Sequence, residues 1–186
     1  MKLFGWFGRR DGHQKVRRQW RDAWTAAVAR EDAAQADALK AALGSLRLQR
    51  DDDFDIELEM LDALERVGAL QAQTAEGSLP VVETHHRVIA GERCHFTAPA
   101  TLPDDPAQTS GRLLFSGSRS VFVGGGRPQP VAWHTVREVI HTDRDVVFVR
   151  ADGSASARFR FNTFADAVEA AFLARRLKGT RGTRGL

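Results

Sequence analysis

The chain has 186 residues, of which 42% are hydrophobic, and a formal net charge of +3. This length can bury a sizeable core, and we expect a small domain with a helical extension rather than one undivided domain. The single cysteine, Cys94, excludes an internal disulfide bond and favours a cytoplasmic location. Because no apolar run approaches the roughly 20 residues that span a bilayer, and the first ten residues lack the pattern of a signal peptide, we expect neither secretion nor a membrane-spanning segment.

Residues 1–12 form a basic and aromatic segment ahead of the first predicted helix. Large apolar side chains precede a pair of arginines, and the candidate membrane- or partner-binding residues are Leu3, Phe4, Trp6, Phe7, Arg9 and Arg10. Aromatic rings suit the headgroup region of a bilayer, and each arginine near an anionic lipid surface contributes ~1 kcal/mol. The segment therefore predicts a weak, salt-sensitive attachment. The alternative is that these aromatic side chains pack on the fold itself.

Residues 13–76 have the periodicity of two helices. Neither proline nor glycine interrupts residues 13–43, so we expect one long helix that ends at Gly44. Its inward stripe is Val16, Trp20, Trp24, Val28, Ala36, Leu39 and Leu43. The acidic run at 51–62 offers N-caps to a second helix, whose inward stripe is Leu58, Leu61, Leu64 and Val67. Two helices joined by a short connection form an antiparallel hairpin.

From residue 80 the apolar period shortens to that of strands. The predicted strands are 81–89, 93–98, 112–117, 119–125, 130–142, 145–150 and 156–161, and 130–142 forms either one bent strand or two short ones. Glycine-containing turns separate them at residues 91–92, 117–118, 124–126 and 152–153. The Asp-Gly pair at 152–153 is typical of a tight hairpin, because both positions tolerate a positive φ.

The end of the chain predicts a closing helix. Either Asn162 or Thr163 provides its N-cap, and the residues expected to face the sheet are Phe164, Val168, Ala171 and Phe172. In the strand before it, phenylalanines alternate with arginines over 158–161, which indicates a sheet with one face toward solvent. A basic tail occupies residues 179–186. The sequence thus predicts an α+β protein with a helical hairpin, an antiparallel sheet of about seven strands and a C-terminal helix.

Two patterns in the C-terminal half resemble a known family. Gly111, Leu113, Ser116, Arg119 and Phe122 match its first pattern, with serine where threonine is usual, and Ala132, Trp133 and Val136 match its second. In these residues the segment 80–178 is similar to the bacterial branch of the pleckstrin-homology (PH) and GRAM-like family. The resemblance implies a strongly bent, PH-like sheet of seven antiparallel strands, capped by a C-terminal helix, that acts as a lipid- or protein-binding module.

Several local clusters contain residue types that carry chemistry. His85, His86, Cys94 and His95 are types that bind zinc. Neighbours on a strand face opposite sides of the sheet, so each face receives about two of these residues, and we expect no metal site. Cys94 is instead predicted to be a small core residue. The glycines at 124–126 lead into a strand rather than a helix, which argues against a phosphate-binding loop.

We therefore expect no catalytic residue and no cofactor. We interpret the chain as a non-catalytic interaction module that docks peripherally on the inner membrane surface through its N-terminal segment and its PH-like domain. The alternative is a protein-protein adaptor or oligomerisation module, paired with itself or with a partner, that does not bind lipid. Nucleic acid is not an expected partner, because the sequence shows neither basic strands interleaved with aromatic residues nor a recognition-helix pattern.

Overall fold

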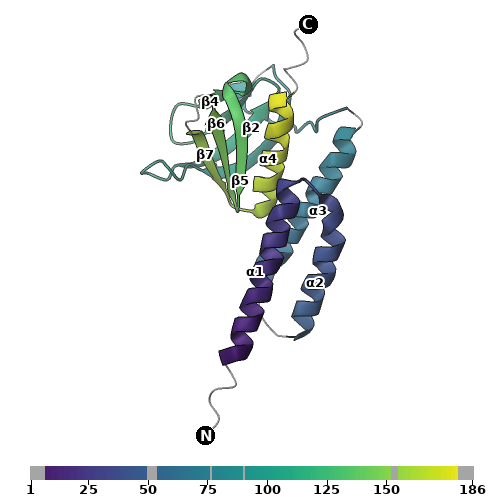
Figure 1. Cartoon of the computed structure of the whole chain (residues 1–186). Helices are drawn as coiled ribbons and strands as arrows, with labels where there is room; N and C mark the ends of the chain where they lie inside the picture. The colour runs from purple at the N-terminus through teal and green to yellow at the C-terminus, as the bar shows by residue number, and fades with distance from the viewer. Residues whose placement is uncertain (1–6, 50–53, 76, 90, 152–154, 180–186) are drawn as a thin grey trace. The chain divides into compact units, whose positions relative to one another are not determined.

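The computed structural model describes residues 7–49, 54–75, 77–89, 91–151 and 155–179 (Figure 1). It contains α-helices and one antiparallel β-sheet, which confirms the predicted α+β class. The chain divides into two compact units, Met1–Gly68 and Ala69–Leu186. We refer to the first as the helical unit and to the second as the sheet unit.

The described part of the N-terminal region contains three helices rather than the predicted two. They are α1 Phe7–Ala29, α2 Ala36–Gln49 and α3 Asp55–Ala75, with a short 3-10 turn at Ala33–Gln35. The prediction of a single helix over 13–43 is wrong, and Gly44 lies inside α2 instead of ending a helix.

The break between α1 and α2 is a helix cap formed without glycine. Glu31 adopts a left-handed backbone conformation with φ of 53°, which is uncommon for a residue with a side chain. The Glu31 N–H donates to the Val28 carbonyl (3.0 Å), and the Asp32 N–H donates to the Ala27 carbonyl (2.8 Å). These two bonds form a Schellman motif, which usually has glycine at the left-handed position. Because no glycine marks this position, the sequence carries no signal that a helix ends between α1 and α2.

Two tryptophans of α1 lie in the core of the helical unit and donate hydrogen bonds to backbone carbonyls of α2 and α3. The Trp20 indole N–H donates to the Leu39 carbonyl of α2 (2.8 Å). The Trp24 indole N–H donates to the Met60 carbonyl of α3 (2.5 Å). Both indole rings are buried, so each provides a large apolar contact and satisfies its one polar group.

The predicted inward stripes are buried except at two positions. Val16 and Leu58 are 43% and 37% exposed, whereas the rest of both stripes is buried. In α3 the inward position next to Leu58 is occupied by Glu57, whose side chain is 0% exposed. Its carboxylate binds Arg17 and Arg21 of α1, and these contacts join the first turn of α3 to α1.

Seven strands form one sheet in the order β4-β3-β2-β1-β7-β6-β5, with every neighbouring pair antiparallel. Their bounds are β1 Cys94–Thr101, β2 Ser110–Ser116, β3 Arg119–Val123, β4 Gln129–Ala132, β5 Val136–Thr142, β6 Asp145–Arg150 and β7 Ala155–Phe161. The number of strands agrees with the prediction. The predicted segment 130–142 is two short strands, and the predicted turn at 152–153 lies outside the described residues.

The prediction of a strand over 81–89 is wrong. The segment forms a 3-10 turn at Arg87–Ile89 and pairs with the sheet through a single isolated bridge at Val82. The His86 N–H donates to the Thr84 hydroxyl (3.3 Å), a local bond that competes with the regular pairing of a strand. The segment therefore lacks the ladder of hydrogen bonds that the sequence analysis expected of it.

The sheet bends until its two edges approach each other. The edge strands β4 and β5 are joined by the 3-10 turn Trp133–Thr135 alone, a connection that spans at most roughly 14 Å. A flat sheet of seven strands would separate its edges by roughly 29 Å. Irregularities in the register of the β1-β2, β5-β6 and β6-β7 pairs, which are typical of bulges, increase the local twist and assist the bend.

The concave side of the bent sheet is filled by aromatic rings and closed by α4 Phe164–Gly179. The buried rings are Phe96, Phe115, Phe122, Trp133, Phe148, Phe159 and Phe161. The helix α4 packs against β1, β5, β6 and β7, and its four predicted inward residues are all buried (Figure 1). Thr163, one of the two predicted caps, accepts a hydrogen bond from the Asp166 N–H through its hydroxyl (3.0 Å). The concave side of the sheet is therefore occupied by packed side chains.

Candidate functional site

The outer face of β1, β2 and β3 carries a second, small apolar cluster. Its buried members are Ile89, Cys94, Leu114 and Val121, and Val88 and Val123 pack against it. Leu114 lies beside Val121 in the β2-β3 register, so both side chains project from the same face. Ile89 comes from the irregular segment before β1 and covers them. This cluster holds the segment before β1 against the outside of the sheet, and we refer to residues 80–89 and 91–92 as the covering segment.

Polar contacts hold the two ends of this covering segment. A His95 ring nitrogen lies 2.8 Å from the Pro80 carbonyl. At the other end, Glu92 forms an ion pair with Arg119 (2.9 Å) and accepts a hydrogen bond from the Ser118 hydroxyl (2.5 Å). Burial raises the pKa of Glu92, but hydrogen bonds from the β2-β3 serines and the charge of Arg119 outweigh it and hold the pKa below its ordinary value.

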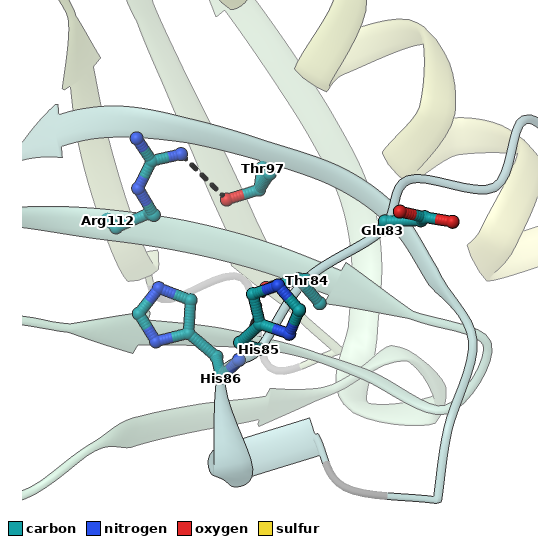
Figure 2. Close-up of a pocket in the computed structure, with 6 residues that line it drawn as sticks. All are labelled: Glu83, Thr84, His85, His86, Thr97 and Arg112. Atoms are coloured by element: carbon teal, nitrogen blue, oxygen red, sulfur yellow. Dashed lines mark hydrogen bonds between the residues drawn. The ribbon is translucent and has the colours of Figure 1, made fainter.

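An open hollow of about 360 Å³ lies between the covering segment and the sheet (Figure 2). Its lining residues are Glu83, Thr84, His85, His86, Thr97 and Arg112. Figure 2 shows Arg112 and Thr97 on neighbouring strands, with the rings of His85 and His86 facing them from the covering segment. The carboxylate of Glu83 lies at the opposite end of the hollow from Arg112. We refer to this feature as the Arg112 hollow.

The Arg112 hollow overturns one step of the sequence interpretation. His85 and His86 were expected to point to opposite sides, but they line the same hollow because their segment is not a strand. Cys94 is 2% exposed in the apolar cluster, as predicted, and burial raises the pKa of its thiol. Among the described residues, no group of three or more His, Cys, Asp or Glu side chains is arranged to hold a metal ion.

Arg112 differs from neighbouring arginines in its partners. Within the described residues its hydrogen-bond partner is the neutral Thr97 hydroxyl, at 3.2 Å from Nη1. Arg119 has the carboxylate of Glu92 (2.9 Å). The residues that flank Arg112 across the strands are Pro99 and Val123, which carry no charge. Arg112 thus lines the hollow with a positive charge that has no carboxylate beside it on the neighbouring strands.

The two arginines of β7, by contrast, are neutralised locally. Arg158 and Arg160 both bind the buried carboxylate of Asp145 on β6, with Arg160 Nε 2.8 Å from Oδ1. Burial raises the pKa of Asp145, but the hydrogen bonds from Arg160 and Arg158 outweigh it and hold the pKa below its ordinary value. The alternation of phenylalanine and arginine in β7 therefore marks a solvent-facing ion-pair network.

A second hollow, of about 420 Å³, lies on the other flank of the covering segment. It is lined by Val88, Arg119, Val121, Arg127, Pro128 and Pro130. Three kinds of side chain, valine, proline and arginine, make up its wall, so it has fewer hydrogen-bonding groups than the Arg112 hollow. The glycines at 124–126 lie in the connection between β3 and β4. This position agrees with the prediction of a turn between strands, which argued against a phosphate-binding loop.

His141 on β5 is a titratable group that the sequence analysis did not single out. Burial lowers its pKa from 6.5 to about 4; the charge of Arg175 adds to this effect, and Asp143 and Asp145 oppose it. The folded state therefore binds a proton less readily than the unfolded chain. The contribution of His141 to stability is therefore fully present above pH 6.5, the ordinary pKa of histidine. It is lost as the pH falls toward about 4, the pKa of His141 in the folded state.

We expect acidification from about pH 6.5 to about pH 4 to cost the sheet unit about 3 kcal/mol through His141. Urea unfolding, followed through the amide cross-peaks of the sheet residues at several pH values, measures this loss. His141→Gln should remove this part of the pH dependence, and the exposed His134→Gln is the matched control. An unchanged pH dependence in His141→Gln would contradict the assignment.

Half of the residues of the predicted N-terminal site lie outside the part of the chain that the structure describes. Leu3, Phe4 and Trp6 fall outside the described residues, and Phe7 is the first residue of α1. Arg9 and Arg10 belong to the first turns of α1, whose first turn contains no acidic residue. Within the described helices, none is long and apolar enough to cross a bilayer.

Comparisons with known proteins give no family assignment. No family model matches the chain, and no curated protein matches it. Among solved structures, the C-terminal domain of an unknown protein from Leishmania infantum is 10% identical, with a TM-score of 0.41 over 59% of this chain and 95% of that one. Inner Membrane Complex sub-compartment protein 3 from Toxoplasma gondii is 14% identical, with a TM-score of 0.36 over 47% and 76%. An activated truncation of Vav1 is 12% identical, with a TM-score of 0.36 over 88% and 45%.

Proposed function

We propose that the chain is a non-catalytic interaction module whose sheet unit is a PH-like binding domain. The observation that carries this proposal is the filled concave side of the sheet. Aromatic rings and α4 occupy the position where an enclosed substrate cavity would lie, while two open hollows occupy the outer face. A rigid, filled scaffold with shallow surface hollows suits recognition of a partner more than chemistry on an enclosed substrate.

The residues behind the PH and GRAM-like resemblance hold structural positions, which supports its use as a fold hypothesis. A side chain at Gly111 would lie 2.4 Å from the Val123 carbonyl oxygen, so the close approach of β2 and β3 requires glycine there. The Ser116 hydroxyl accepts the Arg119 N–H (3.2 Å), and the Ser116 carbonyl accepts the Trp133 indole N–H (2.8 Å). These contacts connect both patterns in one corner of the sheet.

The proposed attachment is peripheral, on the inner surface of a membrane, through the N-terminal segment. Its aromatic side chains would enter the headgroup region while Arg9 and Arg10 attract anionic lipid. Two arginines at ~1 kcal/mol each give only weak binding, so the sheet unit would have to contribute a second contact for stable attachment.

A protein-protein adaptor is the second candidate, and one observation favours it. The helical unit exposes apolar side chains of α1 and α3, namely Val16, Ile56 and Leu58. The Arg17–Glu57 ion pair joins the two helices beside these residues. Exposed apolar side chains on two helices suit burial against a partner helix or a second copy of this chain.

Vesicle flotation separates the two candidates. We expect the full chain to float with vesicles that contain anionic phosphatidylglycerol, and high salt or deletion of residues 1–10 to abolish flotation. Replacing Arg9 and Arg10 with glutamine should remove the salt sensitivity, whereas the same change at the exposed Arg127, in the sheet unit, is the control. Binding that survives the deletion would contradict docking through this segment. Absence of binding, together with a dimer by light scattering that Ile56→Asp dissociates, would favour the adaptor.

A further inference from the structure

We propose that the Arg112 hollow is an oxyanion site that takes the phosphoryl group of a small phosphate monoester. This inference rests on the proposed function, because it treats the sheet unit as a binding module, and it adds the chemistry of the ligand. The site is formed by the outer face of β1 and β2 together with residues 83–86. All six of its lining residues belong to the sheet unit.

The charge of Arg112 provides the first part of the argument. A guanidinium group binds phosphate oxygens in a bidentate manner, and its charge strengthens each hydrogen bond. Arg112 uses Nη1 for the Thr97 hydroxyl and has no acidic residue beside it on the neighbouring strands. The bond to Thr97 orients the guanidinium, and Arg112 forms part of the wall of the hollow (Figure 2). An anionic ligand would supply the missing opposite charge.

The hydroxyl and imidazole groups provide the second part. Thr97 accepts a hydrogen bond from Arg112, and Thr84 accepts one from the His86 N–H, so each hydroxyl keeps its own hydrogen to donate. The imidazole rings of His85 and His86 each offer at least one further N–H group. A phosphoryl group has three strong acceptor oxygens, which matches this set of donors.

The size of the hollow and the position of Glu83 define the rest of the ligand. A volume of about 360 Å³ lies at the lower end of the range for small-molecule sites. Glu83 lies at the end away from Arg112, where its carboxylate repels a second anionic group and accepts hydrogen bonds from hydroxyl or ammonium groups. The geometry therefore favours a phosphate monoester with a hydroxyl or an amine at its other end. O-phosphoethanolamine is such an ester, because it carries an ammonium group at its other end and no second anionic group.

The test is an NMR titration of the full chain with inorganic phosphate, and then with O-phosphoethanolamine, at constant ionic strength set with sodium chloride. We expect saturable shifts at the Thr97 and Arg112 amides and at the Arg112 Nε–H. Arg112→Gln should weaken binding by at least about tenfold, since a charged hydrogen-bond partner is lost. The matched control is Arg127→Gln, which makes the same change in charge outside the hollow and should leave the affinity within about twofold.

Three outcomes would overturn the proposal: shifts that do not saturate, shifts located elsewhere, or an equal loss of affinity in Arg112→Gln and Arg127→Gln. The amide spectrum of Arg112→Gln verifies that the variant is folded, and His85→Gln with His86→Gln gives a second variant that leaves the sheet unchanged. Vesicles containing a phosphatidylinositol monophosphate distinguish the source of the phosphoryl group. Flotation that depends on Arg112 assigns it to a lipid headgroup, and no such dependence assigns it to a soluble ligand. A negative phosphate titration beside positive flotation through residues 1–10 would remove this inference and leave the proposed function intact.

Discussion

Replacement of Trp133 by alanine is expected to destabilise the sheet unit by about 3 to 5 kcal/mol. Trp133 is 1% exposed and contacts the rings of Phe115 and Phe148 edge-on, at centroid distances of 5.1 and 5.5 Å. Its indole N–H donates to the Ser116 carbonyl (2.8 Å). The alanine variant would leave a large cavity and an unsatisfied buried carbonyl. It would also weaken the short turn that brings the edges of the sheet together.

A second variant separates the contribution of the ring from that of the hydrogen bond. Trp133→Phe keeps most of the aromatic contact but leaves the Ser116 carbonyl without its donor, so we expect a smaller loss of about 1 to 3 kcal/mol. His134→Ala, at the exposed next position of the same turn, should change stability by less than about 0.5 kcal/mol. Urea unfolding read from the amide cross-peaks of β1–β7 measures all three. Equal losses in the alanine and phenylalanine variants would show that ring packing is not the main contribution.

Removal of both arginines that bind Glu57 is expected to cost the helical unit about 3 to 5 kcal/mol. Arg17 binds both carboxylate oxygens (2.6 Å each), and Arg21 Nε binds one of them (2.7 Å). The Glu57 side chain is 0% exposed, whereas those of Arg17 and Arg21 are 33% and 42% exposed. Arg17→Gln combined with Arg21→Gln would leave a buried carboxylate without counter-charges. Glu57→Gln should cost less, about 1 to 2 kcal/mol, because the freed arginines can reach water.

The pH dependence gives this prediction a second measurement. In the wild type, burial raises the pKa of Glu57, but the hydrogen bonds and charges of Arg17 and Arg21 outweigh it, so the pKa lies below the usual 4.5. Stability through this group is therefore present above pH 4.5 and is lost as the pH falls. In the double variant only burial remains, the pKa rises above 4.5, and the variant should recover stability as the pH falls toward it.

An exposed ion pair between the same kinds of element is the matched control. Lys40 of α2 and Glu65 of α3 are 3.1 Å apart and have side chains that are 64% and 45% exposed. Lys40→Gln should cost less than about 1 kcal/mol, since water screens this pair. A loss in the double arginine variant that is no larger than in Lys40→Gln would contradict the role assigned to Glu57.

The Arg112 hollow exists because a segment with a strand-like sequence does not form a strand. A ladder over 81–89 would have placed the two adjacent histidines on opposite faces of the sheet. Instead the Thr84 hydroxyl accepts a nearby backbone N–H, and the Ile89 side chain is buried on the outer face of the sheet. The chain then crosses this face and leaves open space on both flanks. The candidate site is thus a direct consequence of the covering segment.

Much of the fold could be predicted because it depends on local patterns. The strands from β2 to β7 follow alternating apolar residues bounded by turns, and the cap of α4 follows a threonine before an amphipathic run. The end of α1 could not be predicted, because Glu31 takes a left-handed conformation that glycine usually marks. Nor could the burial of Glu57, since a carboxylate within an inward stripe is stable only where arginines from another helix reach it.

The sequence by itself determined the α+β class, the order of most elements and the burial of Cys94 and of the helix residues Trp20, Trp24, Phe164 and Phe172, because these depend on periodicity and apolar character along the chain. Only the tertiary structure decided which polar side chains meet. Arg112, Thr97 and His86 come together through strand register and through the path of a covering segment, and residues so separated in sequence leave no periodic pattern. Long-range packing fixes such contacts, and a candidate site composed of them becomes visible only when the chain is folded.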